Sequence, residues 1–365
     1  MKDNNFLGRN DFIWFSGVVE DRKDPQKTGR VRVRCLGHHT QGTSELPTED
    51  LPWAQVIMPS TSPGVSGLGQ SPSFLVEGAW VFGYFRDGDS CQEPVVIGSM
   101  PGHPMDYAVK ILGFNDPNGI YPKYKNEPDV NRLAVNNPDL PHGSLTLRKA
   151  VRKTNIPTAD FNALKAADDS DIFASDGDQW SQPIIPYGTI YPYNHVYESE
   201  SGHLMEYDDT LDNERIYQAH KTGTSYEISP DGTKTEIIKG DHYNITLGKS
   251  QAAIEGQSDI SIDGRHKVYI NKSGSANNHY DIQIGPNSNI NIQVDKGNIN
   301  LVTVEGNINI NSGGDYNLKV AGNYTSKILG NKSETVEGTK TSNTTSSVIH
   351  RGSTIDLNPD WDPGA

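Results

Sequence analysis

The stretch from Gly232 to Gly264 reads GTKTEIIKGDHYNITLGKSQAAIEGQSDISIDG, and the stretch from Gly306 to Gly338 reads GNININSGGDYNLKVAGNYTSKILGNKSETVEG. In both stretches glycine returns at every eighth residue. The repeating glycines are Gly232, Gly240, Gly248, Gly256, Gly264, Gly306, Gly314, Gly322, Gly330 and Gly338. Because glycine makes up only 36 of the 365 residues, composition does not produce this spacing twice. The two blocks therefore indicate an internal repeat of eight residues.

A β-branched aliphatic residue stands two positions before the glycine in seven of these ten repeats. These residues are Ile238, Ile254, Ile262, Val304, Val320, Ile328 and Val336. We interpret each octad as one short strand with one buried side chain, closed by a glycine corner. Such a corner requires glycine either for a positive φ or for close approach of another backbone. Stacked units of this kind form a β-solenoid.

A single chain offers this solenoid too little apolar surface, since Asn, Ser, Thr, Lys and Asp fill most other octad positions. One chain would bury little and leave its strand edges open. We therefore expect several chains, most simply three, to close an intertwined triple-stranded β-helix, a homotrimeric prism. With about 4.8 Å per stacked strand, residues 232–338 would form a needle on the order of 65 Å long.

Two other repeat architectures compete with the prism. Calcium-binding nonapeptide repeats require a period of nine and an aspartate after a glycine pair, whereas Thr233, Lys249 and Gln257 follow glycines here. A monomeric solenoid of the pectin-lyase type has longer coils and larger apolar ladders. The octads fit neither pattern well, and the prism remains the preferred interpretation.

The N-terminal region predicts a small barrel. Strands are expected at 12–19, 30–36, 52–59, 79–85 and 94–100, with Val31, Val33 and Cys35 alternating against arginines in the second. Five short strands in this space suit the OB fold. The glycine-rich loop 60–74 is either a contact surface or an ordinary exposed loop.

The remaining chain is expected to connect the barrel to the needle. Ten prolines between 101 and 193 predict an extended linker that packs along its neighbours. Three strands are expected between 201 and 232, and the prism is expected to continue between the two blocks with a two-residue irregularity. The expected domains are an OB domain at 1–105, a linker at 106–195, a needle at 196–350 and a tip at 351–365. The fold class is all-β.

Composition excludes several classes of function. A net charge of −14 argues against nucleic acid as a partner. No apolar run has the length of a signal peptide or a membrane span, so we expect synthesis in the cytoplasm and no integral membrane protein. We expect Cys35 and Cys91 to be reduced thiols in the core, and a disulfide between them is the alternative. The histidines show no ligand spacing, and we expect no metal and no cofactor.

Several segments carry a family resemblance. WFSGVVEDR at 14–22, GRVRVR at 29–34 and LPW at 51–53 resemble the barrel of the central spike proteins of contractile-tailed bacteriophages. SGHLMEYDD at 201–209, ERI at 214–216 and DG at 231–232 resemble the base of the needle in that family and in VgrG spikes of type VI secretion. The resemblance implies a virion protein of the tail baseplate that docks to a hub ring protein through its barrel. It also implies transient contact with the host outer membrane and, since no His-x-His tip motif is present, a metal-free tip or a separate PAAR-like tip protein.

The lytic activity of the T-even members is not expected here. Their muramidase domain lies between barrel and needle, and residues 101–195 are too short and proline-rich for it. A glycosidase needs two carboxyl groups at a fixed separation. The available acids, Glu127, Asp129, Asp168, Asp169 and Asp171, are expected in solvated turns. The sequence thus predicts a structural, cell-puncturing spike and no enzyme. The alternatives are a peptidoglycan or polysaccharide hydrolase on a β-helical stalk and a VgrG-like spike.

Overall fold

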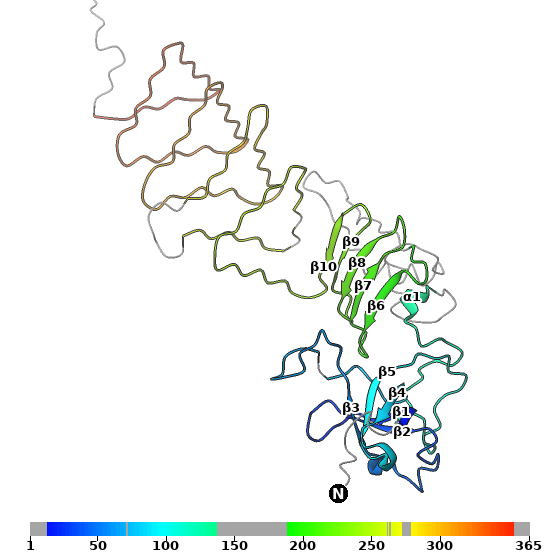
Figure 1. Ribbon diagram of the computed structural model, residues 1–365. Coiled ribbons are helices and arrows are strands. Elements are labelled where there is room, and N and C mark those ends of the chain that lie inside the picture. Colours follow the sequence, from blue (N-terminus) through cyan, green and yellow to red (C-terminus); the bar gives the residue numbers. More distant parts are fainter. Residues whose placement is uncertain are drawn as a thin grey trace, which may run out of the picture. The chain divides into compact units, whose positions relative to one another are not determined.

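The computed structural model describes residues 13–70, 72–136, 188–260, 262, 264–271 and 279–353 (Figure 1). The chain divides into two compact units, residues 1–268 and 269–365. Strands and short turns make up almost all regular structure in the described residues, and the one α-helix there has four residues. The expected all-β class is confirmed.

The N-terminal strands close a barrel, as expected of an OB fold. The strands are β1 (Ile13–Asp21), β2 (Val31–Cys35), β3 (Trp53–Val56), β4 (Trp80–Phe85) and β5 (Pro94–Ser99). They close in the order β1-β2-β3-β5-β4, and only β3 and β5 run parallel. Two single-turn 3-10 helices, η1 (Thr48–Asp50) and η2 (Gly88–Ser90), lie in the connections.

The barrel core follows the alternation of its strands. Its fully buried members are Phe15, Val19, Val31, Val33, Cys35, Ala54, Val81, Phe85 and Val96. Gly83 is required where β4 meets β5, because a Cβ there would lie 2.1 Å from the Val95 carbonyl oxygen. The five strands expected from sequence are therefore all present, each within a few residues of its expected bounds.

A second sheet follows later in the chain. It contains β6 (Asn194–Glu198), β7 (Leu204–Asp208), β8 (Arg215–Ala219), β9 (Ser225–Ile228) and β10 (Lys234–Ile237), in the order β10-β9-β8-β7-β6. All pairs are antiparallel and follow one another along the chain (Figure 1). Three strands were expected before the octads, and the first octad was expected to be a strand, which is β10; the sheet adds β6 at its other edge. The short helix α1 (Arg132–Val135) packs against β6.

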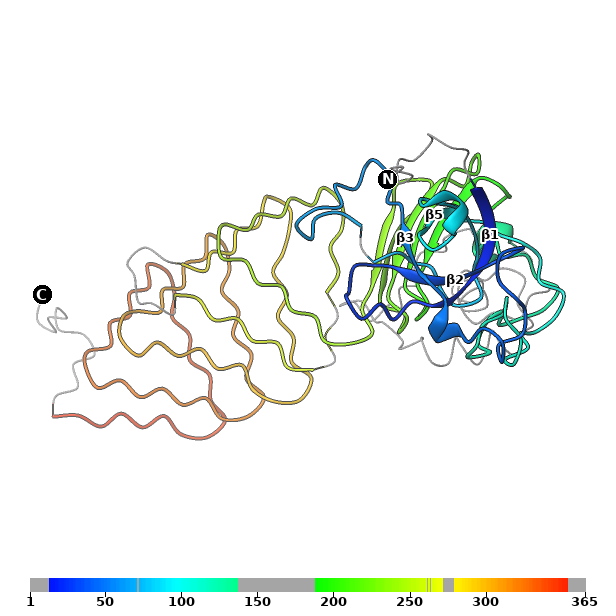
Figure 2. The ribbon, with the colours of Figure 1, turned by 60° about the horizontal axis from the view of Figure 1, so that its bottom comes forward.

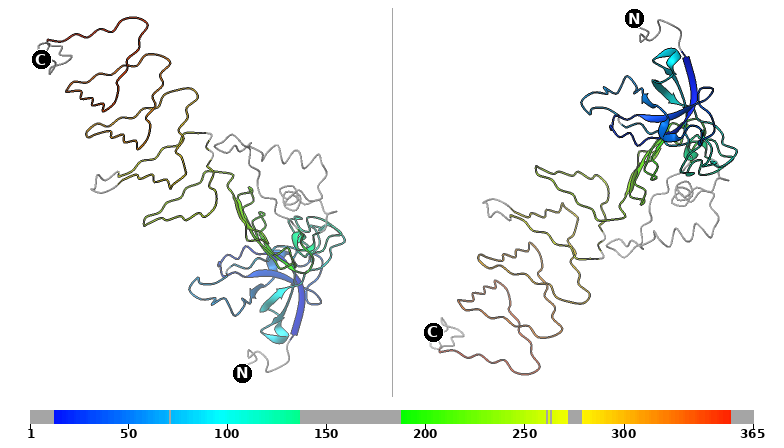
Figure 3. Two further views of the ribbon diagram at one scale, coloured as in Figure 1. Left: turned by 90° about the horizontal axis from the view of Figure 1, so that it is seen from above. Right: turned by 90° about the horizontal axis from the view of Figure 1, so that it is seen from below.

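Beyond β10 no described residue lies in a strand. Figures 2 and 3 show residues 279–353, drawn in yellow to red, as a succession of wide open turns. A β-strand forms where its backbone N–H and C=O groups are hydrogen-bonded to a neighbouring strand. These turns stand apart from one another in a single chain. Among the residues described beyond β10, no strand pairing within one chain is present, and the β-helix expected for this region stays a prediction.

Candidate functional site: the octad repeats and the sheet before them

The octad glycines mark the bends of the C-terminal chain. Gly232 lies in the hairpin between β9 and β10, where its N–H donates to the Ser229 carbonyl oxygen at 2.9 Å. At each of the other nine glycines the backbone bends, and the residues between bends run without a further turn. The sequence repeat is therefore also a geometric repeat, in which each octad is one straight segment and one corner.

The bends continue where the glycine pattern does not. Between the two blocks the chain turns at 286–287 and bends at 295–297, and after Gly338 it bends again at 345–346. From the turn at 286–287 to Gly306 the spacing of these bends exceeds eight residues. Residues 272–278 lie outside the described residues, so the irregularity expected between the blocks stays a prediction. The last bend shows that the corner can be made by Thr345 and Ser346, so glycine alone does not reveal every repeat.

The glycine corners are open in one chain. Of the ten glycines, Gly232 has a φ of +82° and Gly306 a φ of +114°, and the other eight lie outside the left-handed region. A Cβ built at any of the ten except Gly306 meets nothing within 4 Å, and at Gly306 the nearest atom, Thr303 Oγ1, lies at 3.7 Å. At eight of the ten corners, therefore, one chain alone does not explain the glycine: its φ is not positive, and no atom lies within 4 Å of the place where a Cβ would be.

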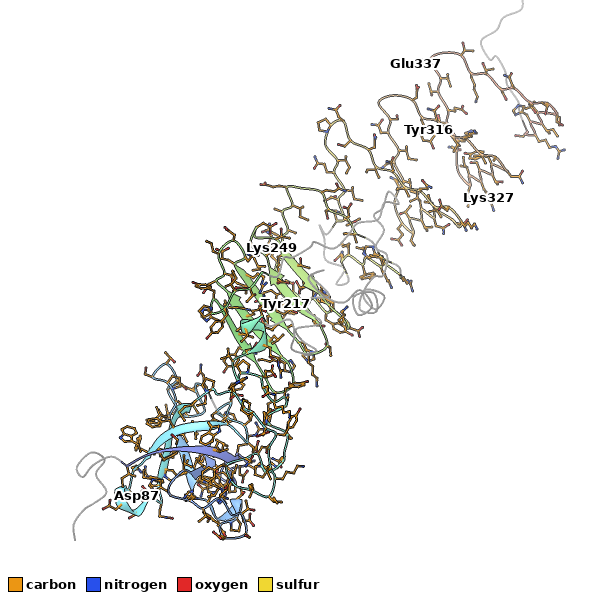
Figure 4. The ribbon with its side chains drawn as sticks, turned by 90° about the vertical axis from the view of Figure 1, so that its right-hand side faces the viewer. Asp87, Tyr217, Lys249, Tyr316, Lys327 and Glu337 are labelled. Atoms are coloured by element: carbon orange, nitrogen blue, oxygen red, sulfur yellow. The ribbon has the colours of Figure 1, made fainter. Side chains whose placement is uncertain are left out.

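The seven aliphatic residues before the corners are not buried in one chain. Ile238 is half-buried, and the other six are between 45% and 95% exposed. Other apolar residues alternate with period two within the segments and are exposed as well. Sequence reasoning did not single out Tyr243, Ile245, Leu247, Tyr316 and Leu318 among them. Figure 4 labels Tyr316, which is 65% exposed.

A buried charged cluster lies in the second sheet, and the sequence did not reveal it. The Arg215 guanidinium donates to Glu206 Oε1 at 2.5 Å and to Asp208 Oδ2 at 2.7 Å, and all three side chains are fully buried. Asn194 donates to the same Glu206 oxygen at 2.7 Å. The motifs at 201–209 and 214–216 contain these residues, and alternation along β7 and β8 puts them on one face.

A second network joins this sheet to the barrel. Arg22, just after β1, donates to both carboxylate oxygens of Glu200 in the β6–β7 turn, at 2.7 and 2.9 Å. Tyr121 donates to Glu200 Oε1 at 2.8 Å. The hydrogen bond from Arg22 lowers the pKa of Glu200, while burial and the neighbouring Glu200 raise the pKa of Tyr121 to about 12.

The first part of the linker belongs to the barrel. Arg34 is fully buried and donates to both carboxylate oxygens of Glu20, at 2.7 and 3.1 Å. The Phe114 N–H donates to the same carboxylate at 2.8 Å, and a Cβ at Gly113 would collide with Arg34. The alternation expected in β2 is thus correct, but its arginine face is covered by linker residues at this point.

The linker acids do not form a glycosidase pair in the described residues. Glu127 is only 5% exposed and forms an ion pair with Arg132, so the expected solvated turn is wrong for this residue. Asp129 accepts from the Gly102 N–H at 2.8 Å. Asp168, Asp169 and Asp171 lie outside the described residues. The two described acids are therefore engaged in structural contacts.

The cysteines and histidines form no metal-binding group of three or more side chains among the described residues. Both cysteines are free thiols, as predicted, and burial raises the pKa of Cys35 to about 12. The ring centroids of His203, just before β7, and His220, just after β8, lie 4.5 Å apart, a pairing the sequence did not suggest. Among the described residues, no group of three or more His, Cys, Asp and Glu side chains is placed to hold a metal ion. No described helix is long and apolar enough to span a membrane.

The loop 60–74 keeps both expected interpretations open. Its tip is closed by a bridge between Val65 and Leu68, and both side chains are more than 60% exposed. Phe74 is also exposed, and its ring contacts that of Tyr197 on β6 at 5.1 Å. The loop therefore presents apolar side chains at the surface, as a contact loop would.

Comparison with known proteins identifies the family. Residues 37–176 match the family described as the Gp5 N-terminal OB domain. The chain is 38% identical over 292 residues to Protein Gp5 of Vibrio phage KVP40, which covers 72% of this chain and 66% of the relative. It is 44% identical over 119 residues to the pre-baseplate central spike protein Gp5 of Enterobacteria phage T4, which covers 31% of this chain and 20% of that protein. The chain therefore belongs to the Gp5 family of phage central spike proteins, which are proteins of the tail baseplate.

Proposed function

We propose that this protein is the homotrimeric, cell-puncturing spike at the centre of a phage tail baseplate, pushed through the host outer envelope when the tail contracts. The observation that carries the proposal is the octad array itself. Its straight segments and corners are regular, yet its apolar side chains are exposed, and the segments described beyond β10 have no bonded neighbours in one chain. Exposed apolar rows and open backbone groups on this scale require partner strands.

Identical neighbours supply those strands most simply, because a repeat in one chain is matched in register by the same repeat in another. Three chains wound about one axis would bury the seven aliphatic residues and the alternating apolar residues in a dry core. They would also bring another chain's backbone close to the glycine corners, which explains glycine at positions with no contact within one chain. Continuous bonding between chains makes such a rod stiff along its axis.

The rest of the chain is proposed to hold this rod in place. The OB domain (1–105) and its apolar loop 60–74 dock to the hub ring protein of the baseplate. The linker (106–195) joins the domain to the needle (196–350), and the last residues (351–365) form the tip or receive a PAAR-like tip protein. Support for a rigid connection comes from the Arg22, Glu200 and Tyr121 hydrogen bonds between the barrel side and the β6–β7 turn.

A lytic role is not part of the proposal. The acids described between barrel and sheet are tied to Arg132 and to a backbone N–H. A dye-release assay on peptidoglycan and on capsule polysaccharide tests this directly. Turnover that is lost on changing a carboxylate between Glu127 and Asp178 would restore the hydrolase alternative.

The solution mass of the full chain tests the spike proposal first. Size exclusion with light scattering is expected to give about 120 kDa, three times the chain mass of 40.0 kDa. A folded particle of the mass of one chain would refute the prism, because the octad side chains would then have no partner strands.

A further inference from the structure

Two histidines lie side by side at one end of the second sheet. The β6–β7 turn and the β8–β9 turn are at the same end, because successive strands of this sheet run in opposite directions. A Cβ built at Gly202 would lie 3.9 Å from the Lys221 Cβ, so the two turns are in contact. His203 closes the first turn and His220 opens the second. Both histidines are therefore held by short, hydrogen-bonded turns.

Strand register sets the two histidines directly opposite each other. Leu204 on β7 pairs with Ala219 on β8, and one further step along both strands brings His203 to His220. The His203 carbonyl oxygen accepts a hydrogen bond from the β6 side of the sheet, and the His220 N–H donates to the β9 side. The two residues thus have the positions of a non-hydrogen-bonded pair, in which opposite side chains approach most closely.

The two imidazole rings are close enough to bind one ion together. Their centroids lie 4.5 Å apart, with an angle of 46° between the ring planes, and both residues are exposed. Imidazole nitrogens are common protein ligands of Zn²⁺, Cu²⁺ and Ni²⁺. Among the described residues no third His, Cys, Asp or Glu side chain completes a larger group, so water would take the remaining coordination positions. A structural zinc centre has four protein ligands, and a site with two is expected to bind more weakly.

Thr222 orients the His220 ring through contacts with its Nδ1. The Thr222 hydroxyl oxygen lies 2.8 Å from this nitrogen, and the Thr222 backbone N lies 3.2 Å from it. The backbone N–H donates to Nδ1 when the ring proton is on Nε2. When the proton is on Nδ1, it is donated to the hydroxyl oxygen, and Nε2 is free to bind a metal ion. Metal-binding histidines normally have this second arrangement, in which the other ring nitrogen donates to an oxygen atom.

We propose that His203 and His220 together bind one late first-row divalent metal ion, Zn²⁺ being the ion expected. The bound ion ties the β6–β7 turn to the β8–β9 turn, next to Glu200, which accepts the hydrogen bonds of Arg22 and Tyr121. The site does not depend on the proposed spike or on the number of chains, because both ligands come from one chain. Spacing along the sequence does not reveal it, since only the pairing of β7 with β8 brings the two residues together.

Calorimetric titration of the metal-free, full-length protein with Zn²⁺ tests the proposal. We expect one ion per chain, with binding weakened at least about tenfold in both His203→Gln and His220→Gln, because outer-shell partners alone contribute about 10–100-fold to metal affinity. The matched control is His195→Gln, which removes another exposed histidine of this sheet, 3.5 Å from the Asp209 carboxylate. This control should leave the affinity unchanged. Affinity that is the same in the unsubstituted protein and in either His203→Gln or His220→Gln overturns the proposal.

Cu²⁺ serves as a probe that counts the bound imidazoles. It binds nitrogen sites more tightly than the other divalent ions of this series. The nitrogen couplings in its electron paramagnetic resonance spectrum should show two imidazoles in the unsubstituted protein and one in either His203→Gln or His220→Gln. One imidazole in the unsubstituted protein would show that the two rings do not share an ion.

Chemical footprinting of the unsubstituted protein needs no variant to fold. Diethyl pyrocarbonate modifies free imidazole nitrogens, and peptide mass spectrometry locates the products. With Zn²⁺ at about ten times its dissociation constant, about one site in ten is free, so the modification of His203 and His220 should slow about tenfold while that of His195 does not change. Equal rates with and without Zn²⁺, or equal slowing at all three histidines, refute the site. Failure of His203 and His220 to react without Zn²⁺ refutes it as well, because rings that are covered in the assembled protein cannot receive an ion.

Discussion

Replacing Arg215 by methionine should destabilise the second sheet more than any change at its surface. Arg215 is fully buried and donates to Glu206 at 2.5 Å and to Asp208 at 2.7 Å, with a Glu227 oxygen 3.8 Å from its Nε. Methionine has a comparable shape and no charge. The substitution therefore leaves the carboxylates of β7 in the sheet without their arginine.

The expected cost follows from what remains after the change. Breaking a buried ion pair by removing one partner costs about 3–5 kcal/mol, because an uncompensated charge stays in a medium that solvates it poorly. The matched control is Lys234→Met in the same sheet, where the ion pair with Glu236 is exposed at 57% and 51%. An exposed pair of this kind contributes about 0–1 kcal/mol.

Amide hydrogen exchange measured by mass spectrometry shows which part of the chain loses stability. Peptides covering β7 and β8 should exchange roughly a hundred- to several-thousand-fold faster in Arg215→Met, which is the same 3–5 kcal/mol at 1.36 kcal/mol per tenfold change. Peptides of the barrel should exchange as before, and Lys234→Met should raise the β7 and β8 rates by less than about tenfold.

One result would refute the reasoning. If Arg215→Met changes exchange in β7 and β8 no more than Lys234→Met does, the two carboxylates are not dependent on this arginine, and the cluster is not a stabilising centre of the sheet.

Three further predictions concern the barrel. Gly83→Ala should lower barrel stability strongly, because the new Cβ would lie 2.1 Å from the Val95 carbonyl oxygen. In the control Gly98→Ala the new Cβ has no atom within 4 Å, so this variant should be tolerated. The midpoints of thermal unfolding of the two variants test the difference. Asp24 has a pKa held below its ordinary value of 3.8, chiefly by the hydrogen bond from Arg30, so its contribution is present above that value and is lost as the pH falls further. Asp24→Asn should therefore be less stable at neutral pH, with a shallower loss of stability in acid titration. Burial raises the pKa of Cys35 to about 12, so a thiol reagent at pH 8 should label Cys35 only after unfolding; rapid labelling of the folded protein would contradict its burial.

The barrel was predictable because its strands obey local rules. Alternation of Val31, Val33 and Cys35 sets the inward face of β2, and turn residues mark the ends of the strands. Alternation does not reveal whether the arginine face of β2 is exposed or covered. Arg34 is fully buried there because linker residues some 80 positions later in the chain cover it and Glu20 on the neighbouring strand β1 pairs with it.

The charged cluster in the second sheet escaped prediction for a related reason. Glu206, Asp208 and Arg215 have the composition of a surface turn region, and charged side chains are seldom fully buried. Only pairing of β7 with β8 in one register brings them together, away from solvent. The same register places Met205 and Ile216, which lie apart in sequence, together on the opposite face of this sheet.

By itself the sequence determined the repeat, the barrel strands and the all-β class, because period and alternation depend on backbone geometry that every strand shares. Tertiary structure decided which glycines close hairpins and which mark corners, and which charges are buried. Gly232 and Gly240 are equivalent in the repeat, yet Gly232 lies in the β9–β10 hairpin, where its N–H donates to the Ser229 carbonyl oxygen, and Gly240 lies at a bend after β10, the last strand among the described residues. That difference depends on whether a hydrogen-bonding partner strand is present in the same chain, and spacing along the sequence carries no record of it.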